Sequence, residues 1–146
     1  MIPEADAALR TIMGTLMMEV APNMRDDYRT ANVNLIAVAA ALIAQDVDRA
    51  VEVRVWENGE MRAILARAAA LVTDAALRSR LVDASRATDP SLRVSELTTA
   101  NSELRRLLIE LHAVVEEMRT PQAAEIDRAI WAFLREAAGR RAIQIG

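Results

Sequence analysis

The chain has 146 residues, of which 53% are hydrophobic and only 3% aromatic, and its 21 acidic and 18 basic residues give a formal net charge of −3. A chain of this length suits one domain with a core of its own. It contains no cysteine, which excludes a disulfide framework, thiolate metal sites and a cysteine nucleophile.

The charge pattern and the N-terminus limit the expected partners and location. All 18 basic residues are arginines that interleave with acids, so the sequence predicts no basic face that would attract nucleic acid. The first six residues lack the basic and apolar regions of a signal peptide. The longest apolar run, residues 35–44, is too short to cross a bilayer. We therefore expect a soluble, cytoplasmic protein that binds neither nucleic acid nor membrane.

The first two elements are predicted to be helices. Apolar residues in the range 5–20 recur at spacings of three and four, which predicts one helix that ends before Pro22. Asn23 is positioned to cap a second helix. On that helix residues 35–44 are apolar on every side, a pattern typical of a helix at the centre of its fold.

The middle of the chain offers two interpretations. Residues 51–56 alternate as a strand does, but a single strand finds no partner elsewhere, and the valines also fit a helix at spacings of four. We predict that the second helix continues as far as the turn signal Asn58-Gly59, which breaks it. A third helix over residues 61–71 and a short helical piece from Asp74 are expected to follow.

The most regular helix is predicted to begin at Asp89-Pro90. Its apolar positions step by three and four through four heptads, with a single asparagine, Asn101, in an "a" position. The heptad positions are Val94, Leu97, Asn101, Leu104, Leu108, Leu111, Val115 and Met118. This pattern fits a coiled-coil dimer or a helix of an intramolecular bundle, and apolar residues beside the stripe favour the bundle.

The last helix is predicted to begin at Thr120-Pro121 and to end at Gly139, followed by a flexible tail over residues 140–146. Taken together, the elements predict an all-α fold. It is an up-and-down helical bundle of four main helices plus one or two short ones, formed as a single domain by residues 1–139.

One helix face carries candidate binding residues. Tyr28, Asn32 and Asp46 fall on the same side of the second helix, with Arg25 one turn around. A buried asparagine must be hydrogen-bonded. Asn32 therefore either bonds a facing polar group such as Asn101, which would fix the helix register, or contacts a ligand beside Tyr28, Asp46 and Arg25.

The sequence contains no recognisable catalytic pattern. Phosphate-binding glycine loops, Ser–His–Asp sets and paired catalytic carboxylates are not apparent. Carboxylate-bridged di-metal bundles use Glu-x-x-His on two helices, whereas the single histidine, His112, follows Glu110 by only two residues. We expect no catalytic residues, no metal and no cofactor.

One stretch carries a family resemblance. It consists of Glu19-Val20-x-Pro22, Tyr28 and Asn34-Leu-Ile-Ala-Val38. Through these residues, the segment 16–45 resembles the first third of a family of uncharacterised bacterial helical proteins. Members of that family are often encoded beside acyl-CoA dehydrogenases and phosphotransferase-like kinases. The resemblance implies a bacterial accessory protein near acyl-CoA metabolism.

Two functions are compatible with these observations. The surplus of apolar helix surface and the lack of catalytic chemistry favour a non-enzymatic bundle that acts through protein contacts, as a homodimer or as an accessory subunit. The alternative is a small-molecule or acyl-CoA-type ligand binder, or an enzyme, with its pocket between bundle helices.

Overall fold

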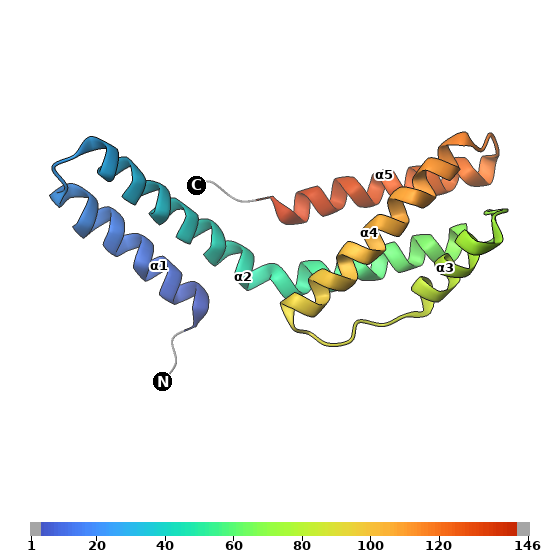
Figure 1. Cartoon of the computed structure of the whole chain (residues 1–146), viewed down its shortest axis with the longest axis horizontal. Helices are drawn as coiled ribbons and strands as arrows, with labels where there is room; N and C mark the ends of the chain where they lie inside the picture. The colour runs from blue at the N-terminus through green and yellow to red at the C-terminus, as the bar shows by residue number, and fades with distance from the viewer. Residues whose placement is uncertain (1–3, 143–146) are drawn as a thin grey trace. The chain divides into compact units, whose positions relative to one another are not determined.

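The computed structural model describes residues 4–142. This part of the chain is helical and contains no strand, which confirms the predicted all-α helical bundle. The helices, shown in Figure 1, are α1 (Ala5–Thr15), α2 (Asp27–Ala68), α3 (Ala75–Arg86), α4 (Val94–Glu117) and α5 (Pro121–Arg141).

The chain divides into two compact units. Among the described residues, the N-terminal unit comprises residues 4–50 and the C-terminal unit comprises residues 51–142. The boundary falls inside α2, so the first part of this helix belongs to one unit and its second part to the other.

In the N-terminal unit, α1 and the first part of α2 run in opposite directions (Figure 1). We call residues 4–50 the N-terminal hairpin. After α1 the chain makes a π-helical turn, Leu16–Val20, and a 3-10 turn, Ala21–Asn23. The α-helical and π-helical part of this segment therefore ends before Pro22, as predicted, and Pro22 lies in the 3-10 turn. Proline lies early in the 3-10 turn, where its missing N–H leaves no hydrogen bond unmade.

The cap of α2 is Asp26 and not Asn23. The Oδ1 atom of Asp26 accepts hydrogen bonds from the backbone N–H groups of Tyr28 at 2.9 Å and Arg29 at 3.3 Å. Asn23 instead donates from Nδ2 to the carbonyl oxygen of Glu19 at 2.6 Å. Aspartate and asparagine are both good N-caps. The turn before α2 places Asp26, and not Asn23, beside the free N–H groups at the start of this helix.

The interior of the N-terminal hairpin consists of small side chains. Its buried residues are Ala21, Ala37, Ala40, Ala44 and Ala50. The prediction that residues 35–44 are central to the fold is wrong, because Leu35, Ile36 and Ile43 are 67%, 58% and 50% exposed. This segment is apolar on every side, but its only buried residues are Ala37, Ala40 and Ala44.

The C-terminal unit contains an extended hydrophobic core formed by the second part of α2 together with α3, α4 and α5. The heptad positions of α4 from Leu97 to Val115 are all buried, whereas Val94 at the start of the helix is exposed. The predicted start of the last helix at Thr120-Pro121 is confirmed, because Thr120 Oγ1 accepts a hydrogen bond from the N–H of Ala123 at 3.1 Å. The buried residues of this helix are Ala123, Ile126, Ile130, Phe133 and Ala137.

Two predicted boundaries in this unit are wrong. Asn58-Gly59 does not break α2, which continues to Ala68. Glycine destabilises a helix by about 1 kcal/mol. The side-chain hydrogen bonds of Asn58 to Asp89 and Leu97 offset this cost and hold α2 in helical form at this point. The sequence Asp89-Pro90 does not open α4, which begins at Val94, because Asp89 uses its carboxylate in these contacts.

The last helix extends past the predicted end. Gly139 lies inside α5, which reaches Arg141, so Arg140 and Arg141 are helical and do not belong to a tail. The rest of the predicted tail, residues 143–146, lies outside the described residues.

Candidate functional site

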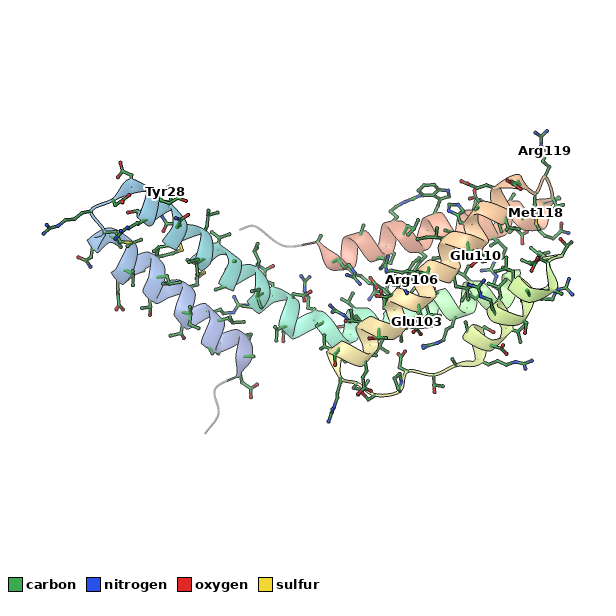
Figure 2. The ribbon with its side chains drawn as sticks, viewed as in Figure 1. Tyr28, Glu103, Arg106, Glu110, Met118 and Arg119 are labelled. Carbon is green, nitrogen blue, oxygen red and sulfur yellow. The ribbon has the colours of Figure 1, made fainter. Side chains whose placement is uncertain are left out.

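The four residues predicted as a ligand site lie on the N-terminal hairpin. Tyr28, at the start of α2 (Figure 2), is 75% exposed, and Arg25 and Asp46 are also exposed. Asn32 is half-buried. These four side chains line none of the cavities described below.

Asn101, the polar member of the heptads, is buried and fully hydrogen-bonded. Its Nδ2 donates to Glu57 Oε2 at 2.8 Å and to Asn58 Oδ1 at 2.9 Å. Its Oδ1 accepts from Arg105 Nε at 2.8 Å. Asn101 therefore bonds Glu57 and Asn58 of α2, and not Asn32 as one of the sequence-based alternatives had it. The bonds join α4 to α2 within the C-terminal unit.

Glu57, on α2, is the centre of this polar cluster and has no exposed surface. Its carboxylate accepts from Arg141 Nε at 2.6 Å and Nη2 at 2.7 Å, and Arg105 Nη2 lies 3.0 Å away. Burial raises the pKa of Glu57, but hydrogen bonds from Arg141, Arg105 and Asn101 outweigh it and lower the pKa below its ordinary value of 4.5. The buried carboxylate is therefore held ionised.

The cluster connects three helices, and its carboxylate has no exposed surface. Glu57 comes from α2, Asn101 and Arg105 from α4, and Arg141 from α5. Both oxygens of the buried Glu57 carboxylate accept hydrogen bonds from side chains of neighbouring helices, as a buried charge requires. We assign it a structural role: it fixes how these helices align.

A cavity of about 430 Å³ lies in the C-terminal unit. Apolar side chains such as Ala84, Pro90 and Leu104 line it, together with Arg62 and Glu103. Glu103 is labelled in Figure 2. Arg62 Nη2 is bonded to Asp89 Oδ1 at 2.7 Å. The Nε atom of Arg62 is buried without a hydrogen-bond partner in the structure of residues 4–142.

The exposed apolar surface is concentrated on the N-terminal hairpin. Ten of the 15 exposed large hydrophobic side chains of the described chain lie there, although the hairpin is the smaller unit. They are Ile12, Met17, Met18, Val20, Tyr28, Leu35, Ile36, Val38, Ile43 and Val47. Such a concentration of exposed apolar side chains in one part of a chain is typical of an interface.

The only histidine lies in a second polar cluster, between α4 and α5. His112 Nε2 is 2.9 Å from Asp127 Oδ1 and 3.7 Å from Glu116 Oε1. The imidazole packs edge-on against Trp131, with 5.6 Å between ring centroids. A second cavity, of about 400 Å³, is lined by Glu116, Asp127 and Trp131 among others.

Comparison of the chain with protein-family models, with curated proteins and with solved structures finds no match.

The sequence analysis missed both polar clusters. Glu57 reads as an ordinary charged residue on a helix, and its partners lie 44 and 84 positions away along the chain. The pair His112-x-x-x-Glu116 was visible, because residues four apart share a helix face. The Glu-x-x-His pattern concerns only residues that precede the histidine, and Glu116 follows it.

Proposed function

We propose that the protein is non-enzymatic and acts through protein contacts, as a homodimer that joins two N-terminal hairpins. One observation carries the proposal: the hairpin buries alanines and exposes its large apolar side chains. Burying one leucine or isoleucine stabilises a structure by about 1.5–3 kcal/mol, and the isolated hairpin gains little of this. A partner that covers the same side chains supplies the missing burial.

A second copy of the chain fits this surface because two hairpins make a four-helix bundle. At about 100° per residue, Ile36, Ile43 and Val47 fall within about 40° of one another and form one stripe along α2. This stripe lies beside the buried alanines, which permit close packing of helices. A symmetric pair of hairpins can cover both stripes at once.

A membrane is the alternative partner that could bury the exposed apolar side chains of the hairpin. By length and composition, α2 contains a candidate span in the described part of the chain, and only 17% of that window is buried. However, its longest stretch without charge, residues 30–45, extends about 24 Å as a helix, less than the roughly 30 Å of a bilayer core. The stretch also includes Asn32 and Asn34. These features favour a protein partner.

The first prediction tests the dimer with two charges placed on the stripe. We expect the wild-type protein to sediment as a dimer that dissociates on dilution. The double variant Ile36→Asp/Ile43→Asp should raise the dissociation constant of the dimer at least about 100-fold. Both isoleucines are exposed in the protomer, so the double variant keeps its helical circular dichroism. Sedimentation velocity over a range of concentrations measures the effect.

The matched control is Ile109→Asp, because Ile109 on α4 is also exposed but lies in the other unit. It should leave the dimer intact. A wild-type protein that is monomeric at all concentrations would contradict the proposal. A monomer that binds phospholipid vesicles through the same isoleucines would also contradict it, because the membrane would then bury these side chains.

A second candidate function is binding of a small ligand in the cavity beside Arg62. Its volume lies in the range of ligand pockets, and the buried Nε of Arg62 is a donor that a ligand oxygen can satisfy. The resemblance described above suggests acyl-CoA-type ligands, whose thioester and phosphate oxygens are such acceptors.

The second prediction concerns this cavity. A coenzyme A ester that binds only the folded protein should stabilise it by about 2.7 kcal/mol at 100 times its dissociation constant, and so raise the thermal midpoint. Ala100→Leu, which fills space beside the cavity, should abolish the shift, whereas Ala129→Leu on α5 should not. An unchanged midpoint across coenzyme A and its short and long acyl esters would rule the candidate out.

A further inference from the structure

The cluster of His112, Glu116 and Asp127 has the composition of a metal site. His112 and Glu116 lie one turn apart on α4, and Asp127 faces them from α5. Each residue offers one donor atom, and the three atoms lie within 4.8 Å of one another. An imidazole nitrogen and two carboxylate oxygens form a donor set that suits zinc and related divalent ions.

We propose that His112, Glu116 and Asp127 bind one divalent first-row transition-metal ion, with zinc as the reference ion. This inference is independent of the proposed dimer, because all three residues lie in the C-terminal unit.

The donor spacing supports the assignment. Zinc binds nitrogen and oxygen ligands at about 2.0–2.2 Å, so two donors of a tetrahedral site lie about 3.3 Å apart. The distances from His112 Nε2, 2.9 Å to Asp127 and 3.7 Å to Glu116, fall on either side of this value. An ion bound among the three atoms replaces the proton of the His112–Asp127 hydrogen bond, and the two carboxylate oxygens, which lie within 4.8 Å of each other, move toward it.

The His112 side chain is fixed by its surroundings, whereas the Glu116 carboxylate is free to move. The side chain of His112 is only 18% exposed and rests against Trp131, whereas that of Glu116 is 60% exposed. Within residues 4–142 neither Glu116 nor Asp127 forms a salt bridge with an arginine, although 18 arginines are present in the chain. Both carboxylates are therefore available to an incoming cation.

A site with three protein ligands leaves one position of a tetrahedral ion open. The cavity of about 400 Å³ lined by Glu116, Asp127 and Trp131 lies directly beside the donors, so this position is accessible to water or to a small anionic ligand. The purely structural interpretation of the cluster is a hydrogen bond between His112 and Asp127 that joins α4 to α5. That interpretation gives Glu116 no role, and this difference makes the two interpretations separable.

The third prediction is that the full-length, tag-free protein binds one equivalent of Zn²⁺ in a calorimetric titration. Glu116→Gln should weaken binding at least about tenfold, because it removes one of three charged or basic donors. Glu117→Gln, the matched control, changes the adjacent exposed carboxylate and should leave binding unchanged. Since Glu116 is mostly exposed, its variant tests the site without disturbing the core.

A second readout uses Trp131 as a reporter. Co²⁺ quenches a nearby indole, and we expect saturable quenching that His112→Ala and Asp127→Asn abolish. Trp131→Phe should remove the signal but keep the calorimetric binding, since the indole is not a ligand. Absence of stoichiometric Zn²⁺ binding, or binding that Glu116→Gln leaves unchanged, would overturn the proposal and leave the cluster as a hydrogen-bonded helix contact.

Discussion

Replacing Glu57 with glutamine is expected to lower the free energy of unfolding by about 2–3 kcal/mol. Removing one partner of a buried ion pair typically costs about 3–5 kcal/mol, because the remaining charge stays buried without compensation. Here the remaining guanidinium groups belong to Arg105 and Arg141, whose side chains are 35% and 45% exposed, so water recovers part of the loss. Urea denaturation at a fixed protein concentration measures the difference.

The matched control for this fourth prediction is Glu60→Gln, one turn further along α2, where the carboxylate is exposed. Its cost should stay within about 0.5 kcal/mol, as for other surface substitutions. Equal effects of the two substitutions would show that the charge of Glu57 does not stabilise the unit, and that shape alone holds α2, α4 and α5 together.

The lowered pKa of Glu57 adds a pH dependence with a definite sign. The folded protein holds this carboxyl ionised more firmly than the unfolded chain does. Its contribution to stability is therefore complete above the unfolded pKa, near 4.5, and is lost as the pH falls through the lower folded value. Between pH 5 and pH 3 the advantage of wild type over Glu57→Gln should shrink, and an advantage that grows there would contradict this account.

Elements whose stability is local were predictable from the sequence. The stripe of α4 and the Thr120 cap of α5 depend on residues three or four positions apart, so periodicity and capping rules locate them. Residues 51–56 show the same principle. They alternate as a strand does, yet they are helical, because residues 4–142 contain no second strand to pair with them.

Features that depend on distant residues were not predictable. Gly59 reads as a helix break, yet α2 passes through it because Asn58 is held by Asp89, Leu97 and Asn101 from other parts of the chain. The apolar run 35–44 has the composition of a core helix, but composition does not say which neighbours exist to cover it. Its exposure is the one feature that reverses the sequence prediction and also supports the proposed dimer.

The fifth prediction compares two apolar side chains of similar size on α4. Leu111 has no exposed surface and belongs to the core of the C-terminal unit, whereas Ile109, two residues earlier, is 70% exposed. Leu111→Ala should lower the free energy of unfolding by about 3 kcal/mol, since it removes buried methyl groups and leaves a cavity among packed side chains. Ile109→Ala should change it by no more than about 0.5 kcal/mol.

Sedimentation velocity of the same two variants separates the core from the proposed interface. The C-terminal unit obtains its stability within one chain, so Leu111→Ala should destabilise the protein without changing its dimer dissociation constant. The hairpin differs, because its large side chains are exposed in the protomer and gain burial only from a partner. If Leu111→Ala weakened the dimer as strongly as the Ile36→Asp/Ile43→Asp variant does, the core of the C-terminal unit, and not the hairpin stripe, would control association.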